Sequence, residues 1–139
     1  MAEHLKLTAL DAEDLAVISA HMQDAVLTLG DIRLLKSAKQ FALVANRFAW
    51  ETGQPERRRS GLHFDRVTKV SAQRIRQGDH NAIVSLLAIS FEEKDPPSGD
   101  IILTFSGGGA IRLEVECIEA RLRDLGPAWG TARQPQHDV

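Results

Sequence analysis

The chain has 139 residues, of which 43% are hydrophobic and 26% charged, and its 17 basic and 19 acidic side chains give a formal net charge of -2. This size and composition are typical of one soluble globular domain that buries about two thirds of its unfolded surface. Because the net charge is close to zero, no global field draws the chain to nucleic acid or to a membrane surface. Nucleic acid is therefore not an expected partner.

The expected location of the protein is the cytoplasm. The first residues lack the basic start and apolar run of a secretory signal. The longest apolar stretches are far shorter than the roughly 20 residues of a membrane span. The single cysteine, Cys117, excludes an intramolecular disulfide framework and is typical of a reducing compartment.

The chain begins with a predicted strand and helix. Alternating apolar and polar residues predict a short strand over His4 to Leu10. Asp11 then resembles a helix N-cap, since its carboxylate can accept a hydrogen bond from the amide of Asp14. We expect the helix to cover about residues 12 to 22.

The middle of the chain predicts consecutive strands joined by short turns. One of them, from Gln40 to Trp50, is apolar on both sides and is expected to be central in its sheet. Another changes the parity of its apolar residues near Asp65 and Arg66, where we expect a β-bulge. The predicted strands cover Ala25 to Ser37 with an interruption at Gly30 and Asp31, Gln40 to Trp50, Arg59 to Val70, and Ala82 to Glu92.

The last third of the chain predicts a β-hairpin followed by a helix. Two alternating runs flank the glycine turn at 106–109, and the segment from Cys117 to Leu125 reads as a helix that ends at Gly126. We expect one α+β domain over residues 1–126. Residues 127–139 form a polar tail that is expected to be partly disordered.

This element order predicts an antiparallel β-meander curled into a partial barrel, with one N-terminal and one C-terminal helix. A terminal helix that covers the open end resembles the plan of pleckstrin-homology-like barrels. That likeness concerns shape and implies no function.

An arginine cluster is the strongest functional candidate. Three consecutive arginines lie across a predicted hairpin from a fourth, and their forked donors suit a carboxylate or a phosphate. A nearby tryptophan could stack on a guanidinium. The alternative is a solvated strand edge, because Glu51 and Glu56 can neutralise part of the charge. The predicted ligand-binding residues are Arg47, Trp50, Arg57, Arg58 and Arg59.

His63 and Asp65 are weaker candidates for a catalytic site. Two residues apart on a strand, they face the same side, and a carboxylate that orients an imidazole is half of a general-base arrangement. No nucleophile motif accompanies them. The alternative is an ordinary surface pair.

No cofactor or metal is predicted. The glycine run at 106–109 precedes a strand rather than the helix that a phosphate-binding loop requires, so a hairpin turn explains it. The five histidines are widely spread and show no metal-ligand spacing with Cys117.

Three segments carry a resemblance to a known family: Phe41 to Phe48, Leu62 to Val67 and Gly107 to Ile118. They resemble a small bacterial family catalogued as domain of unknown function 2948, and the likeness extends from about Leu5 to Trp129. The resemblance implies a single bacterial domain. It supplies no activity, substrate or catalytic residue.

Three functional hypotheses follow. The first is a non-enzymatic binding or interaction module that engages an anionic ligand or an acidic protein surface through the arginine cluster. The second is a small enzyme with a site at His63 and Asp65. The third is a self-associating protein that completes its burial as a homodimer.

Overall fold

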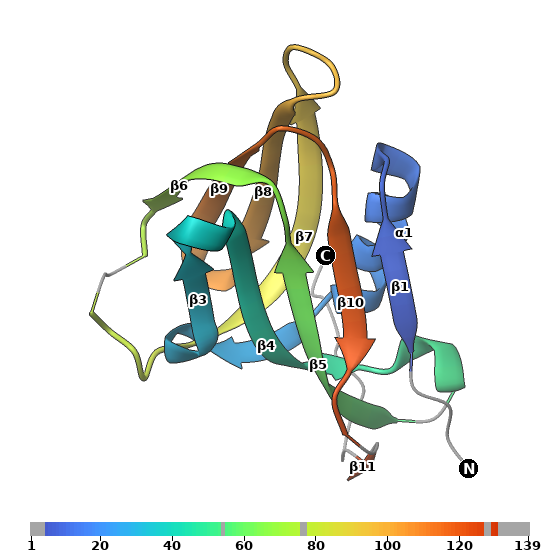
Figure 1. The fold of residues 1–139 in the computed structure, drawn as a ribbon. Helices are drawn as coiled ribbons and strands as arrows, with labels where there is room; N and C mark the ends of the chain where they lie inside the picture. The colour runs from blue at the N-terminus through green and yellow to red at the C-terminus, as the bar shows by residue number, and fades with distance from the viewer. Residues whose placement is uncertain (1–4, 54, 76–77, 127–128, 131–139) are drawn as a thin grey trace.

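The computed structural model describes residues 5–53, 55–75, 78–126 and the backbone of 129–130. Within them the chain forms one α-helix and an 11-stranded antiparallel sheet (Figure 1). The elements are β1 (Lys6–Ala9), α1 (Ala12–Met22), β2 (Ala25–Thr28), β3 (Ile32–Leu35), β4 (Gln40–Phe48), β5 (Glu56–Phe64), β6 (Val67–Gln73), β7 (Ile83–Glu93), β8 (Gly99–Phe105), β9 (Ala110–Val115), β10 (Ala120–Asp124) and β11 (Trp129–Gly130).

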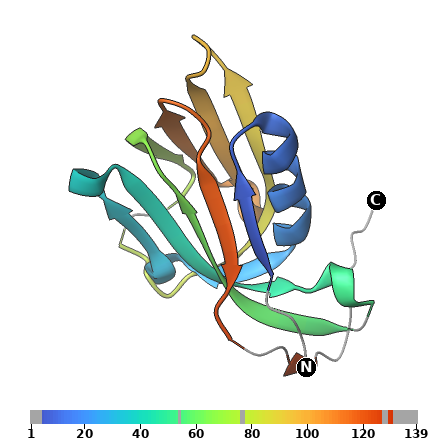
Figure 2. The same cartoon turned by 45° about the vertical axis from the view of Figure 1, so that its right-hand side comes forward.

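The sheet bends over on itself into two layers. Its order is β1-β10-β5-β4-β2-β7-β8-β9-β6, while β3 also pairs with β4 and β11 with β5. Strands β1, β10, β5 and β4 form the front layer, and β7, β8 and β9 lie behind it (Figures 1 and 2). The sheet does not close, because its two end strands, β1 and β6, do not pair in the part of the chain that the structure describes.

Helix α1 covers the side of the molecule where β1 and β7 lie, and it contacts both strands (Figure 2). Asp11 caps the helix as predicted, accepting a hydrogen bond from the Asp14 amide at 2.8 Å. Leu15, Ile18 and Met22 are spaced to share one helical face, and all three are buried. The predicted bounds of this helix are confirmed.

The core fills the space between the layers with inward-facing residues from both. In the front layer one inward row crosses four strands in direct register, Leu7 with Leu122, Leu62 and Leu43. In the back layer β8 alternates its side chains, and Ile101, Leu103 and Phe105 are buried. The inner face of each layer is therefore mostly apolar, as expected of two packed antiparallel layers.

The predicted helix over Cys117 to Leu125 is wrong. Residues 120–124 form strand β10, which pairs with β1 on one side and β5 on the other. Burial alternates along it with period two, since Ala120, Leu122 and Asp124 are buried and the residues between them are exposed. The helix propensity of Glu, Ala, Arg and Leu is small compared with the pairing and burial that two neighbouring strands provide. The pleckstrin-homology-like plan depended on this helix, and the described residues contain no C-terminal helix.

At Asp65 and Arg66 themselves the chain turns between layers, and the β-bulge of this region lies just beyond them, between Val67 and Lys69 in the ladder of β6 with β9. Strand β5 ends at Phe64, Arg66 takes a left-handed conformation with φ of 59°, and β6 begins at Val67. These two residues carry the chain from the front layer, where β5 pairs with β4 and β10, to the back layer, where β6 pairs with β9. The change of parity in the sequence marks a change of layer.

Other predictions are confirmed or lie outside the described residues. The interruption at Gly30 and Asp31 is a short 3-10 turn, and the glycine turn joins β8 to β9 as expected. In the predicted tail, residues 127–128 and 131–139 lie outside the described part of the chain, and β11 pairs with β5. No helix in the described residues is long and apolar enough to cross a membrane.

The strand assignment of residues 120–124 makes a specific prediction. Leu122→Ala should lower the free energy of unfolding by about 2–5 kcal/mol, because it empties a buried core position. Leu125→Ala should cost less than about 1 kcal/mol, because that residue is 46% exposed. In a helix the two leucines would share one face. Similar losses for both variants in chemical denaturation would contradict the strand.

Candidate functional site: a buried ion cluster beneath a basic groove

A buried ion pair joins β4 to β10 at the lower end of the front layer. Arg47 and Asp124 both have fully buried side chains. The Arg47 guanidinium donates to the Asp124 carboxylate from Nε at 2.9 Å and from Nη2 at 3.0 Å. Both side chains point inward because they occupy the alternate positions that are buried along their strands.

A second carboxylate binds the other side of the same guanidinium. Glu51, in the 3-10 turn Trp50–Thr52, accepts from Arg47 Nη1 at 2.8 Å and from Nη2 at 2.7 Å. Burial alone would lower the pKa of Arg47, but the hydrogen bonds from its side chain to Glu51 and Asp124 hold that pKa well above its ordinary value. The pKa of Glu51 is lowered, chiefly by its hydrogen bonds with Arg47. Arg47 therefore stays charged between two carboxylates.

Asp124 also accepts hydrogen bonds from three further groups. These are the Ser60 hydroxyl at 2.6 Å, the Leu5 amide at 2.9 Å and Arg58 Nη1 at 3.3 Å. Burial would raise the pKa of Asp124, but the hydrogen bonds from Arg47, Ser60 and Leu5 outweigh it and hold the pKa well below its ordinary value. One carboxylate thus connects β1, β4, β5 and β10.

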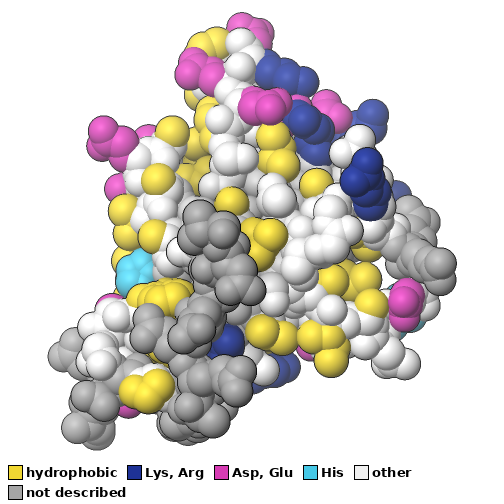
Figure 3. All heavy atoms as spheres, turned by 180° about the vertical axis from the view of Figure 1, so that it is seen from behind, with side chains coloured by type: hydrophobic (Ala, Val, Ile, Leu, Met, Phe, Trp, Pro, Cys, Tyr) yellow, Lys and Arg dark blue, Asp and Glu magenta, His cyan; other side chains and the backbone are white. Residues whose placement is uncertain are grey.

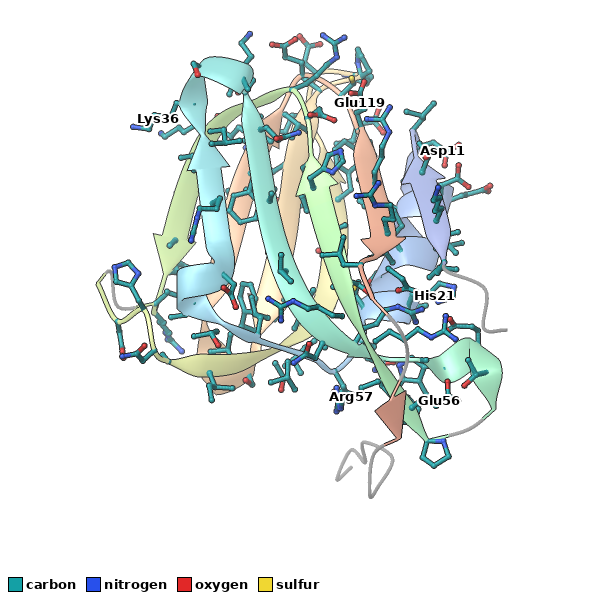
Figure 4. The ribbon with its side chains drawn as sticks, turned by 60° about the horizontal axis from the view of Figure 1, so that its bottom comes forward. Asp11, His21, Lys36, Glu56, Arg57 and Glu119 are labelled. Atoms are coloured by element: carbon teal, nitrogen blue, oxygen red, sulfur yellow. The ribbon has the colours of Figure 1, made fainter. Side chains whose placement is uncertain are left out.

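The arginines of the predicted cluster do not share one face. Arg58 is in direct register with Arg47 and points inward with it, whereas Arg57 and Arg59 take the outward parity of β5. Arg57 donates to the carbonyls of Asn46, at 3.0 Å, and Asp24, and burial lowers its pKa. Arg59 is exposed. Figure 4 shows Arg57 and Glu56 at the lower end of the front layer, with His21 nearby.

Trp50 serves the same end of the molecule. Its indole Nε1 donates to the Gln23 carbonyl at 3.2 Å, and its ring meets Phe48 edge-on at a centroid distance of 4.5 Å. The tryptophan therefore fastens the turn after β4 to the chain just after helix α1. Ligand binding by Trp50 and the four arginines stays a prediction.

The outer face of the front layer carries a groove of about 420 Å³ that sequence reasoning missed. Two outward rows cross the same four strands in direct register. The first row is Lys6, Arg123, Gly61 and Val44, and the second is Thr8, Arg121, His63 and Ala42. Leu125 lies over Gly61, where a β-carbon would be only 3.4 Å from its methyl group. The only signal in the sequence was the alternation of apolar and polar residues in segments 4–10 and 117–125. Because the second segment was predicted to be a helix, the alignment of its basic residues with Lys6 and Thr8 was not recognised.

The charged side chains that line this groove are all basic. Lys6, Arg121 and Arg123 line it, and the described residues that line it include no carboxylate. Arg121 is partly balanced from the rim by Asp65, at 3.2 Å, and by Glu119. Lys6 and Arg123 form no ion pair among the described side chains. The groove therefore has positive walls and an apolar floor.

His63 and Asp65 do lie together, at the upper end of this groove. His63 Nε2 is 3.5 Å from Asp65 Oδ2, and Asp65 is also held by Gln40 at 3.0 Å and by Arg121. Of the hydroxyl and thiol side chains described, Thr8 is the one that lines the groove. Catalysis at this pair stays a prediction.

A separate charged network at the end of β7 and β8 is balanced within itself. Asp100 is almost fully buried, yet Lys94 approaches its carboxylate to 2.9 Å and Arg112 donates to it. The hydrogen bond from Lys94 lowers the pKa of Asp100, with Arg112 adding to the effect. Figure 3 shows side chains of both signs gathered at this end of the back layer. No group of three or more metal-ligating side chains occurs among the described residues.

The fold and the groove define a class: an α+β protein whose bent, open antiparallel sheet presents a basic groove on its outer face. The chain belongs to the family described as Protein of unknown function (DUF2948), whose model matches residues 5–137. No curated protein and no solved structure matches it. The family assignment confirms the family named from the sequence, and its bacterial origin stays a prediction.

Breaking the buried ion cluster should be costly. Asp124→Asn should lower the free energy of unfolding by about 3–5 kcal/mol, because it leaves the buried Arg47 guanidinium without its full partner. Glu116→Gln is the matched control, since Glu116 pairs with Lys39 at the surface and its loss should leave stability nearly unchanged. Urea denaturation at pH 7 measures both. Equal effects would contradict the role of Asp124.

The same carboxylate predicts a pH dependence. Because the folded-state pKa of Asp124 is depressed, its contribution is complete above the unfolded-state pKa of about 3.9 and is lost as the pH falls through the folded-state value. The difference in unfolding free energy between the wild type and Asp124→Asn should therefore be constant from pH 7 to 5 and shrink below about pH 4. Denaturation series at several pH values measure it, and a difference that grows in acid would contradict the assignment.

Proposed function

We propose that the protein is a non-enzymatic binding module that takes an anionic compound with an apolar body in the groove on its front layer. The residues proposed to bind the anionic group are Lys6, Arg121 and Arg123. This proposal moves the anion site from the predicted arginine cluster to the outer face of the neighbouring strands.

One observation carries the proposal. Lys6 and Arg123 are direct cross-strand partners on an exposed face, so two cations lie opposite each other. Like charges at such positions destabilise an antiparallel pair. No described side chain compensates for them, and an anion bound between them would. A purely structural role for this face does not explain why both positions are basic.

The rest of the groove supports the same class of ligand. Its floor is formed by Ala42, Val44 and Leu125, and Thr8 and His63 add polar groups at the sides. An apolar floor with a few polar groups that fix orientation is the usual design of a small-molecule site. The volume of about 420 Å³ is within the range of such sites.

The buried cluster is proposed to support this site rather than to bind the ligand. Asp124 lies in the strand position directly after Arg123, and its carboxylate fixes β10 against β1 through the Leu5 amide. A substitution of Arg58 would disturb Asp124, so it would not separate binding from folding. Variants at Lys6 and Arg123 act on the outer face and leave that cluster intact.

The test compares probes with the same apolar body and opposite charge. Decanoate and decylammonium are titrated into the protein by calorimetry, with inorganic phosphate as an anion that lacks the apolar body. Decanoate should bind better than either. A ligand present at about 100 times its dissociation constant should add roughly 2.7 kcal/mol of stability, which thermal denaturation detects independently.

Two variants locate the site. Lys6→Gln with Arg123→Gln should weaken decanoate binding roughly tenfold or more. Ala42→Phe should weaken it by filling the groove floor without a change of charge. Lys36→Gln, on a different part of the surface, is the matched control (Figure 4). Equal affinity for decanoate and decylammonium, or full binding by the double variant, would contradict the proposal.

The other hypotheses remain predictions with their own tests. An enzyme at His63 and Asp65 predicts turnover that His63→Ala removes while the fold is retained. A homodimer predicts a doubled mass in light scattering at micromolar concentration.

A further inference from the structure

We propose that the free edge of β6 binds an extended peptide of a partner protein, one that alternates apolar and acidic residues and adds a strand to the sheet. The site is a second groove, of about 510 Å³, between β6 and the end of β3. It lies apart from the basic groove of the front layer and does not depend on the function proposed there.

The groove lies along a strand edge, because β6 is the last strand in the sheet order. Strand β9 pairs with one side of β6, and no strand among the described residues pairs with its other side. Six consecutive residues of β6, from Val67 to Ala72, line the groove, together with Leu34 and Lys36. Added strands bind such edges through main-chain hydrogen bonds.

Apolar side chains on both sides of the groove are incompletely covered. Leu34 is in register with Phe41, which is buried, so the two side chains share the core face of their strands, yet Leu34 is 39% exposed. Across the groove Val70 is in register with the buried Leu113 and is only partly buried. Apolar side chains of an inserted strand would complete the core layer between Leu34 and Val70.

The outer rim of the groove selects the charge of the peptide. Lys36 forms no ion pair among the described side chains, and Lys69, which is 70% exposed, lies 3.9 Å from Glu114. Arg33, in β3, is exposed as well. The lining residues include two lysines and no carboxylate. The outward side chains of the peptide are therefore acidic, while the inward ones are apolar.

A hydrogen bond closes one end of the groove, and the lining residues set the length of its occupant. The Val67 amide donates to the Lys39 carbonyl at 2.9 Å. The six lining residues of β6 span roughly 20 Å, enough for an extended segment of about six residues.

The experiment uses two labelled heptapeptides on the full chain. One alternates Glu and Val, and the other alternates Lys and Val. Fluorescence anisotropy measures affinity, and amide NMR spectra locate the binding. We expect the acidic peptide to bind better, with shifted amides in Thr68 to Ala72 and with exchange protection at those amides that point away from β9. Lys36→Glu with Lys69→Glu should weaken it roughly tenfold and reverse the preference for charge.

Lys6→Glu, in the other groove, is the matched control and should leave peptide binding unchanged. Binding of neither peptide at millimolar concentration would overturn the proposal, as would equal binding of both by the wild type. Shifts confined to β1 and β10 would also overturn it. If the amides of β6 shift with protein concentration alone and peptide does not displace the effect, the occupant is a second copy of the chain and the proposal is wrong.

Discussion

The carboxylate of Asp124 connects strands that lie far apart in the sequence. It receives hydrogen bonds from Arg47 of β4, Ser60 of β5 and the backbone just before β1, and it belongs to β10 itself. Burial of a lone charge at this position would be prohibitive, so the carboxylate is retained only because every one of these donors is in place. The front layer thus has a single point at which all of its strands must be assembled correctly.

This constraint also determines which faces remain available for binding. Because β-strands alternate their side chains, fixing Asp124 inward turns Arg121 and Arg123 outward, and fixing Arg58 inward turns Arg57 and Arg59 outward. The arginines of these strands therefore divide into an inward pair, Arg47 and Arg58, that contacts the buried Asp124, and an outward set. Composition gives no hint of this division, which follows from strand parity.

The N-terminal half of the fold could be predicted because its local signals agree with its tertiary structure. Asp11 caps a helix with one apolar face, and the turn at Gly30 separates two strands. The wrong predictions concern segments whose structure is determined by contacts between strands rather than by the local sequence. In β7 a bulge between Leu86 and Ala88 resets the parity, so Leu86 and Ile89 are both buried whereas Leu87 between them is exposed. In β10 the strand exists because β1 and β5 flank it.

The candidate site escaped sequence reasoning for the same reason. Its rows join residues near position 6, near 43, near 62 and near 122, and only the register of four strands brings them together. Periodicity identified three of these four strands, but nothing local specifies which strands become neighbours. His63 and Asp65 were recognised because they are two residues apart, and they are indeed close.

The pairing of β1 with β10 has a consequence for biosynthesis. Lys6 to Ala9 find their sheet partners only in Ala120 to Arg123, more than a hundred residues later. During translation the first strand therefore stays unpaired until residues 120–123 have left the ribosome. The late closure of such a distant contact is slow, and exposed strand edges invite association with other nascent chains in the interval. The charged and polar outer face of β1 makes the unpaired strand less prone to associate with other chains.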